Sequence, residues 1–415
     1  MLDRLLEATG GQAREASADD AVDGVTAKWV TAPASTEQAA AVLQATADEG
    51  AVVVVRGRGT ALDWGVPPRA VDVVVSTEAL DGIVEHEAGD LVCTVEAGTR
   101  IDDVNAAVAD SGQQLALDQP VPGASVAGTL STARSGPRRM LYGSPRDLVL
   151  GVTMVRADGV VAKAGGKVVK NVAGYDLAKL LGGAYGTLGL VTRMVVRLHP
   201  LPTASRWLTC SYPSTDDAVA AAGAVVGSQL APTAVEVRRD AGADGADVHV
   251  LLEGTDQGVA ERLPAATEML GPGSGDGQAD ASSLARIEAG GGDVLVKVSV
   301  PLTRVADVLR TVAELEAWLG LPCRVSGSAG VGVLHVVVTG TAGAAVKAAE
   351  ATAGLRVATG QDTGAGSAVV LRAPTEVRAL VDTWGPVPAL ELMRRVKAEF
   401  DPDHRLAPGR FVGGI

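Results

Sequence analysis

Aromatic residues are scarce in this chain, whose 415 residues include only 2 Phe, 4 Tyr and 5 Trp. The interior must therefore be built from Val, Ala and Leu, which suits strands and short packed helices. Cysteine is scarce too, since Cys93, Cys210 and Cys323 are an odd number without CxxC spacing. They cannot supply the four thiolates of an iron–sulfur cluster. We expect reduced, buried cysteines and a cytoplasmic location.

The sequence lacks the features that mark several functional classes. The formal net charge of −13 argues against nucleic-acid binding, which usually requires a basic patch. No run of about 18 residues is apolar enough to span a bilayer, and the N-terminus MLDRLLEATGGQAREAS does not resemble a secretory signal. Any association with the inner face of the cell membrane is expected to be peripheral, through partner subunits. The five histidines show no HxH or HExxH pattern, so no metal site is expected.

The chain divides near the segment His199-Pro200-Leu201-Pro202. Before it, strands and helices mix without a strict βαβ rhythm, as in the expected helix over 35–49 and the expected strand Val52–Val55. After it, strand-like runs such as 331–338 alternate with helix-like runs such as 304–319. This alternation predicts a sheet covered by helices on one face, and the whole pattern predicts an α+β fold.

Glycine is abundant in two segments that could bind an anionic ligand. Seven glycines lie within residues 163–189 before a β-branched run, and Arg56-Gly57-Arg58-Gly59-Thr60 follows the expected strand Val52–Val55. Glycine lets the backbone approach a ligand closely, and a loop of N–H groups can meet a pyrophosphate. A plain turn between strands is the alternative. Neither G-x-G-x-x-G nor G-x-x-x-x-G-K-[ST] occurs, so the Rossmann and P-loop readings lack their signature.

A third segment, residues 118–152, is rich in small residues and hydroxyls. Such residues could line a narrow groove and bond phosphate and ribityl oxygens. A surface loop is the alternative interpretation, although this segment continues directly into Arg138, Arg139, Tyr142 and an expected strand.

Taken in order, three segments resemble the FAD-binding domain of the vanillyl-alcohol oxidase/para-cresol methylhydroxylase (PCMH) family: RGRGT…WG, VPGASVAGTLSTARSGPRRMLYGSPRDLVLGV and GGKVVKNVAGYDLAKLLGGAYGTLGLVT. The runs SGPRR and KNVAGYD most resemble the FAD-binding E subunit of bacterial glycolate oxidase. The tail VKAEFDPDHRLAPGRF resembles the closing stretch of the family. The resemblance implies an N-terminal segment (1–24), a PCMH-type FAD-binding domain of two subdomains (25–202), an α+β cap with an antiparallel sheet covered by helices (203–390) and a segment returning to the FAD domain (391–415).

The resemblance also implies which residues bind FAD. The pyrophosphate would be held by Arg56, Gly57, Arg58, Gly59 and Thr60, with Gly65 in the same segment. The phosphate–ribityl groove would be lined by Pro122, Gly123, Ala124, Ser125, Gly128, Ser131, Thr132, Ser135 and Gly136. The extended body of the cofactor would pack on Gly186, Gly189 and Val191. Tyr175 and Asp176 are expected to brace their loop. Family members with covalent flavin often carry a histidine near the first loop, but the nearest here is His86, so noncovalent FAD is expected.

The cap departs from the family pattern. Stand-alone 2-hydroxy-acid dehydrogenases of the family carry H-x-G-D-G-N-x-H, whereas this chain reads SAGVGVLH over 328–335. His335 is the one candidate that remains in this motif as a base for a hydroxyl proton, and an ordinary strand residue is the alternative. Arg138, Arg139, Lys167 and Lys170 could hold a carboxylate, contact FAD phosphate or face solvent.

These observations favour a FAD-dependent oxidoreductase: a subunit of a glycolate-oxidase-type complex that acts on glycolate or another small 2-hydroxy acid. A second flavin subunit and an iron–sulfur subunit are its expected partners. Two alternatives stay open. One is a self-sufficient FAD-linked 2-hydroxy-acid dehydrogenase with His335 as base, and the other is a flavin-binding scaffold without chemistry of its own.

Overall fold

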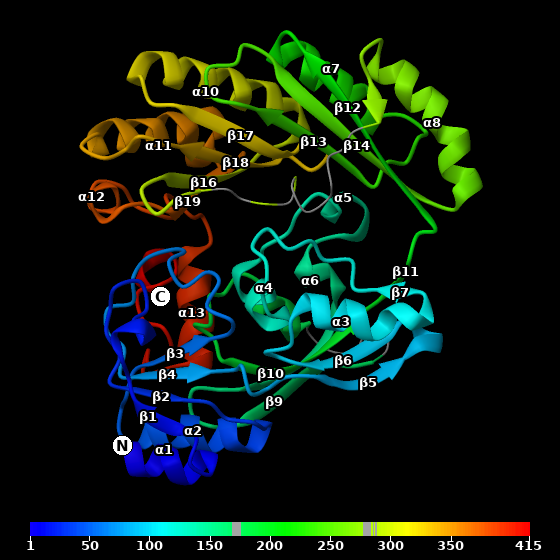
Figure 1. Ribbon diagram of the computed structural model, residues 1–415. Coiled ribbons are helices and arrows are strands. Elements are labelled where there is room, and N and C mark those ends of the chain that lie inside the picture. The colour runs from blue at the N-terminus through cyan, green and yellow to red at the C-terminus, as the bar shows by residue number, and fades with distance from the viewer. Residues whose placement is uncertain (168–175, 277–283, 285, 287–288) are drawn as a thin grey trace. The chain divides into compact units, whose positions relative to one another are not determined.

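The computed structural model describes residues 1–167, 176–276, 284, 286 and 289–415, and these form two compact units (Figure 1). The first unit comprises residues 1–134, 143–201 and 389–415, and the second comprises residues 135–142 and 202–388. Lys170 and Tyr175 lie outside the described residues. The domain limits inferred from the sequence stay a prediction.

The first unit contains a four-stranded sheet in the order β1-β2-β4-β3, in which β2, β4 and β3 run parallel. Its strands are β1 (Ala13–Glu15), β2 (Trp29–Thr31), β3 (Val53–Arg56) and β4 (Val73–Ser76). Helices α1 (Leu2–Thr9) and α2 (Thr36–Asp48) accompany it. Helix α2 begins after Ser35, whose hydroxyl accepts a hydrogen bond from the Gln38 amide, and it buries Val42 and Leu43. Such a serine satisfies a backbone N–H group that has no partner within the first turn of the helix.

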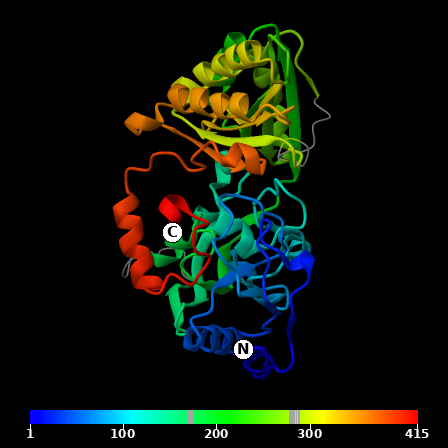
Figure 2. The same cartoon turned by 90° about the vertical axis from the view of Figure 1, so that its left-hand side faces the viewer.

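A second sheet of the first unit has the order β5-β6-β10-β8-β9 and is antiparallel throughout. Its strands are β5 (Ile83–Glu87), β6 (Val92–Glu96), β8 (Val149–Val155), β9 (Val161–Gly165) and β10 (Leu190–Arg197). The two-residue strands β7 (Gln113–Gln114) and β11 (His199–Pro200) pair separately. The helices of this part are α3 (Ile101–Val108), α4 (Val126–Thr132), α6 (Pro145–Leu148) and, from the C-terminal segment, α13 (Leu390–Phe400). Figure 2 shows α13, in red, returning to this unit.

The second unit is built on an antiparallel eight-stranded sheet in the order β15-β12-β14-β13-β17-β18-β16-β19. The strands are β12 (Ala204–Tyr212), β13 (Ala234–Arg239), β14 (Ala246–Gly254), β15 (Gly275–Asp276), β16 (Val294–Ser299), β17 (Cys323–Ser328), β18 (Val333–Val338) and β19 (Ser367–Arg372). The helices are α5 (Arg139–Tyr142), α7 (Thr215–Val226), α8 (Asp256–Leu270), α10 (Val305–Leu319), α11 (Ala345–Thr359) and α12 (Thr375–Arg378).

Helices α7, α8, α10 and α11 cover one face of this sheet (Figure 1). Alternate strand residues, among them Val237, Val296 and Leu334, join these helices in one apolar core, as a period of two requires. The α+β expectation for this part of the chain is therefore confirmed.

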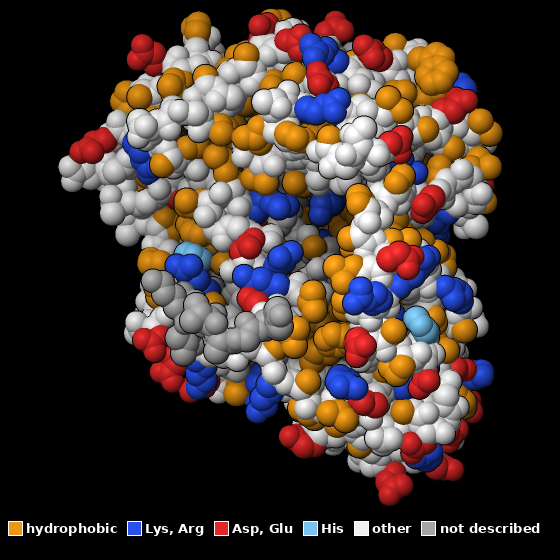
Figure 3. Space-filling view, turned by 180° about the vertical axis from the view of Figure 1, so that it is seen from behind, with side chains coloured by type: hydrophobic (Ala, Val, Ile, Leu, Met, Phe, Trp, Pro, Cys, Tyr) orange, Lys and Arg blue, Asp and Glu red, His pale blue; other side chains and the backbone are white. Residues whose placement is uncertain are grey.

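The surface seen from behind carries Lys and Arg side chains interspersed with Asp and Glu (Figure 3). Among the described residues, no helix has both the length and the apolar character needed to cross a membrane.

Candidate functional site

A cavity in the first unit gathers most of the residues expected to bind a cofactor. It encloses about 750 Å³, part of it open to solvent. The predicted residues that line it are Gly57, Arg58, Gly59, Thr60, Ser125, Gly128, Ser131, Thr132, Gly186, Gly189 and Val191. They come from the loop after β3, from α4 with its N-cap, and from the start of β10 with the loop before it.

Close packing explains one of these glycines, and backbone conformation explains a second. A Cβ atom on Gly57 would lie 2.5 Å from Ser125 Oγ, so this position admits no side chain without a shift. Gly59 has a φ of 72°, which L-residues rarely adopt. The Ser125 hydroxyl in turn caps α4 by accepting a hydrogen bond from the Gly128 amide at 3.2 Å. The loop after β3 and the start of α4 are thus packed together by small residues.

Three arginines supply positive charge to the cavity, and none of its described lining residues is Asp or Glu. Arg134 is 5% exposed, donates to Thr60 Oγ1 at 2.7 Å, and lies over the Trp64 ring at 5.0 Å. Arg410 is 3% exposed and donates to the Leu62 and Trp64 carbonyls at 2.9 Å each.

Arg58, the third cation, donates to the Gly98 carbonyl at 3.0 Å and pairs with Asp81 at 2.8 Å. A glycine cradle with three fixed guanidinium groups suits the two negative charges of a pyrophosphate. The residues present therefore fit FAD.

Tyr185 lines the same cavity in an unusual conformation. Its φ is 54°, and its ring stacks on Phe411 with the ring centroids 5.9 Å apart. Burial raises the pKa of the Tyr185 phenol to about 12, so the phenol is neutral at physiological pH.

Sequence reasoning missed Arg134, Tyr185 and Arg410 as cavity residues. Signals for them existed, because each stands inside a quoted motif: STARSGPRR, GGAYGTLG and LAPGRF. The spacing of these motifs does not reveal which side chains turn inward.

Other predicted residues lie elsewhere. Arg56 pairs with buried Asp20 at 3.1 Å, and Asp20 also accepts from Arg14 at 2.7 Å. The hydrogen bond from Arg14 holds the pKa of Asp20 well below its usual value. Gly65, Pro122, Gly123 and Ala124 are not among the described residues that line the cavity. Lys167 pairs with Glu85, and Asp176 pairs with Lys179 at 3.4 Å.

Ser135 and Gly136 belong to the second unit and line a different pocket. The pocket also involves Arg139, Glu236, Ser326, Ser328 and His335. Its walls come from the segment that leads into α5 and from β13, β17 and β18. The structure thus brings predicted His335 together with Arg139.

His335 is a weak base in this setting. Burial, together with the charges of Lys297 and Arg139, lowers the pKa of His335 to about 3. Its imidazole is therefore neutral at physiological pH. A base whose conjugate acid has so low a pKa is poorly matched to accept a hydroxyl proton near pH 7. The catalytic role of His335 stays a prediction.

Two protein families match parts of the chain. Residues 27–165 match the FAD binding domain family, and residues 378–411 match the C-terminal domain of FAD linked oxidases. These matches agree with the chemistry of the cavity and identify FAD as the cofactor.

Several curated proteins resemble the chain over different lengths. Glycolate oxidase subunit GlcD of Bacillus subtilis is 28% identical over 208 residues, which cover 50% of this chain and 44% of that protein. Glycolate oxidase subunit GlcE of Escherichia coli is 41% identical over 104 residues, covering 25% and 30%. D-lactate dehydrogenase of Archaeoglobus fulgidus is 26% identical over 425 residues, covering 92% and 91%. Except for the dehydrogenase, these relatives are matched over less than half of their own length.

Among solved structures, 4-ethylphenol oxidase from Gulosibacter chungangensis superposes with a TM-score of 0.74 at 16% identity, covering 99% of this chain and 96% of that one. At this identity the similarity concerns the fold alone. The expected fold is confirmed: the chain has the α+β fold of the vanillyl-alcohol oxidase/PCMH-type flavoproteins.

Proposed function

We propose that this chain is the FAD-binding subunit of a glycolate-oxidase-type complex. The complex would oxidise glycolate or another small 2-hydroxy acid to the 2-oxo acid, with a second flavin subunit and an iron–sulfur subunit as partners. The observation that carries the proposal is the cavity of the first unit. There a glycine-bearing loop meets three buried or half-buried arginines, two of which lie in the region that matches the FAD binding domain and one in the region that matches the C-terminal domain of FAD linked oxidases.

Two further observations support a subunit rather than a complete enzyme. GlcE and GlcD are both glycolate oxidase subunits by name, and GlcE is 41% identical over the part that it shares with this chain. The cap also lacks most polar residues of the H-x-G-D-G-N-x-H pattern, with Val331 and Val333 in two of those places.

Each set of residues has a role in this proposal. Bound FAD would supply a two-electron acceptor for oxidation of the acid. Arg58, Arg134 and Arg410 would neutralise its pyrophosphate, and Gly57 and Gly59 admit it by leaving space. No described lining residue of the cavity is His or Cys, which supports noncovalent binding. In the second unit, Arg139 offers a cation for a carboxylate, while the low basicity of His335 argues for help from a partner in proton removal.

A self-sufficient 2-hydroxy-acid dehydrogenase is the second candidate. The observation in its favour is the D-lactate dehydrogenase of Archaeoglobus fulgidus, which is similar over 92% of this chain. A scaffold that holds flavin without chemistry is the third candidate, and the apolar Val331 and Val333 favour it.

An anaerobic visible spectrum of the purified chain tests these candidates. Flavin absorption that acid precipitation releases into solution is expected, as for noncovalent FAD. Glycolate or D-lactate added to the chain alone should leave the flavin oxidised, and addition of the partner subunits should then allow bleaching. Bleaching of the isolated chain would establish the self-sufficient enzyme instead. If the assembled complex oxidises the acid while the flavin of this chain stays oxidised, the chain is a scaffold.

A further inference from the structure

A second cavity of the first unit lies beside helix α13 and is lined mostly by apolar side chains. We call it the α13 pocket. Its space of about 300 Å³ is at the lower end of the range for small-molecule sites in proteins. One wall is α13 with Ala389 before it, and the other wall comes from the segment 179–188. Arg146 of α6, Phe411 and Ile415 complete the lining, and all of these residues belong to the first unit.

Helix α13 carries an apolar stripe that the protein covers only in part. The stripe follows the spacing of one helix face and lines the pocket with Ala389, Leu392, Met393 and Val396. Within α13, Lys397 alone is buried. The Leu392 side chain is 57% exposed, and Leu180 of the other wall is 41% exposed. Exposed apolar side chains that converge on a hollow are typical of a surface that binds an apolar ligand.

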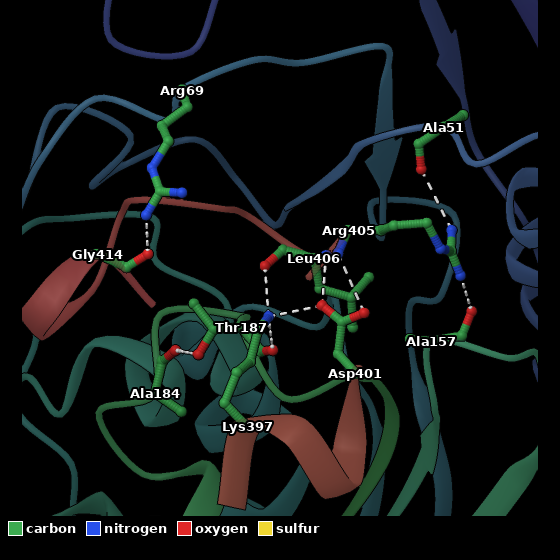
Figure 4. Close-up of polar contacts among 10 residues, drawn as sticks. All are labelled: Ala51, Arg69, Ala157, Ala184, Thr187, Lys397, Asp401, Arg405, Leu406 and Gly414. Carbon is green, nitrogen blue, oxygen red and sulfur yellow. Dashed lines mark hydrogen bonds and ion pairs between the residues drawn. The ribbon is translucent and has the colours of Figure 1, made fainter. Parts of the chain in front are cut away.

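The two walls are joined beneath the pocket. Lys397 of α13 donates a hydrogen bond to the carbonyl of Thr187 at 2.7 Å, and Thr187 lines the pocket from the other wall (Figure 4). The carbonyl oxygen of Ile415 accepts a hydrogen bond from the Phe411 amide at 2.9 Å. These contacts hold the pocket open, so that a ligand can enter without separating the walls.

Positive charge lies on the wall that α13 does not form. Among the described residues that line the pocket, the charged side chains are those of Arg146 and Lys179, in a chain whose formal net charge is −13. Both residues adjoin Gly182, where an added Cβ atom would lie 3.4 Å from the Arg146 Cβ atom and 3.4 Å from the Lys179 carbonyl oxygen. The two cations therefore serve the same part of the pocket.

Two carboxylates lie near these cations but do not line the pocket. Asp176 pairs with Lys179 at 3.4 Å, and the Asp176 side chain is 52% exposed. An ion pair this exposed contributes little free energy, so another carboxylate can replace Asp176. Asp147, next to Arg146, instead accepts hydrogen bonds from the amide and the hydroxyl of Ser144 at 2.9 and 2.7 Å.

We propose that the α13 pocket binds an amphipathic monocarboxylate, an unbranched acid with an alkyl chain of medium length. The chain lies on the apolar stripe of α13, and the carboxylate lies at Arg146 and Lys179. A small 2-hydroxy acid has too little apolar surface to cover the stripe. An acidic amphipathic helix of another protein is the competing occupant, but a cavity of about 300 Å³ suits a single alkyl chain better. The inference is independent of the proposed function.

The pocket shares one segment of its wall with the cofactor cavity. Ala184, Thr187 and Leu188 line the α13 pocket, whereas Tyr185 and Gly186 line the cofactor cavity. The test therefore uses the holoprotein, in which FAD fills the cofactor cavity, and records flavin absorption throughout. Binding in the α13 pocket should leave the flavin in place.

Calorimetric titration with hexanoate, octanoate and decanoate tests the apolar part of the site. Each methylene group that is removed from water should raise the affinity roughly fourfold. Leu392→Glu should weaken decanoate binding at least about tenfold, because it removes apolar surface and adds a like charge. The variant should fold, since Leu392 is exposed and an acidic residue is favourable in the first turn of a helix. Val357→Glu, at a position 74% exposed on α11, is the matched control and should bind decanoate as the parent does.

A double variant tests the charged part. Arg146→Gln/Lys179→Gln should weaken decanoate binding about tenfold, the effect of losing two largely exposed ionic contacts. Arg310→Gln/Lys347→Gln removes the same two charges from the second unit and should leave the affinity unchanged.

Equal affinities for hexanoate and decanoate, or decanoate binding that neither Leu392→Glu nor the double variant weakens, would overturn the proposal. Loss of flavin absorption during the titration would also overturn it, because decanoate would then be competing for the cofactor cavity. If decanoate does not bind but Leu392→Glu weakens assembly with a partner subunit, the pocket is a protein contact and the proposal is wrong. If Leu392→Glu does not fold, the chain-length series and the double variant decide.

Discussion

Lys397 Nζ lies 2.6 Å from Asp401 Oδ2, and both side chains are fully buried in the first unit (Figure 4). The ammonium group also donates to the carbonyls of Thr187 and Leu406, at 2.7 and 2.9 Å. Asp401 accepts further hydrogen bonds from the amides of Leu406 and Arg405. The pair thus ties the C-terminal segment to the loop between Gly186 and Gly189, which lines the cofactor cavity.

Replacement of Lys397 by Met should strongly destabilise the first unit. It leaves the Asp401 carboxylate buried without its cation, and breaking such a pair typically costs about 3–5 kcal/mol. Chemical denaturation followed by circular dichroism measures the change. Arg394→Met is the control, because Arg394 pairs with Glu391 on the exposed side of the same helix, where an ion pair contributes about 1 kcal/mol or less. If both variants lost the same free energy of unfolding, the buried pair of Lys397 and Asp401 would not be the stabilising contact.

Gly57→Ala should empty the cofactor cavity, because the new Cβ atom would lie 2.5 Å from Ser125 Oγ. Removing that hydroxyl in Gly57→Ala/Ser125→Ala leaves a 3.7 Å contact to the Ser125 Cβ position, which is ordinary packing. The double variant should recover part of the bound FAD, although it lacks the N-cap of α4, worth about 1 kcal/mol. The ratio of flavin to protein absorbance measures occupancy. Gly89→Ala, with no neighbour within 4 Å of the added atom, is the control. A double variant that binds no more FAD than Gly57→Ala would refute the steric explanation.

Much of the fold follows from periodicity and capping. The expected helices over 35–49 and 304–319 agree with α2 and α10 to within one residue at each end, since both segments carry apolar residues at helical spacing. Strand β17, in contrast, was not predicted. Its sequence CRVSGS alternates, but Gly327 weakens the strand signal. The structure explains this glycine, since a Cβ atom there would lie 2.4 Å from the Val333 carbonyl oxygen.

The glycine residues and most hydroxyl residues of the candidate site, together with Arg58, were predicted from the motifs that resemble the family. Arg134 and Arg410 were not identified, because their roles arise from tertiary packing: Arg410 reaches the carbonyls of Leu62 and Trp64, about 350 residues earlier in the chain. Likewise, His335 of β18 lies opposite Lys297 of β16 because of the strand order, which no local pattern encodes.

Arg134→Met should weaken FAD binding by about 10- to 100-fold, the range expected for losing a charged hydrogen-bond donor. The FAD affinity of Arg134→Lys should lie between those of the parent and Arg134→Met, because lysine keeps the charge but lacks the planar guanidinium that reaches Thr60. Quenching of flavin fluorescence on titration with the apoprotein gives the dissociation constant. Arg146, an exposed arginine outside the cavity, provides the control as Arg146→Met. Unchanged affinity in Arg134→Met would remove Arg134 from the cofactor site.

The neutral state of the half-buried His335 should make the protein acid-sensitive. Its pKa is about 3 in the folded chain against about 6.5 as the ordinary value, so between these values the unfolded state binds more protons than the folded state. Stability should therefore rise with pH across this window and be lost as pH falls from about 6.5 towards 3. His335→Gln cannot take up the proton, so its free energy of unfolding should decline less on acidification than that of the parent. Denaturant unfolding of both proteins at pH 8, 6 and 5 measures the difference, and the pH 8 values provide the reference because His335 is neutral in both states there. Parallel declines would mean that the pKa of His335 is the same in the folded and the unfolded protein.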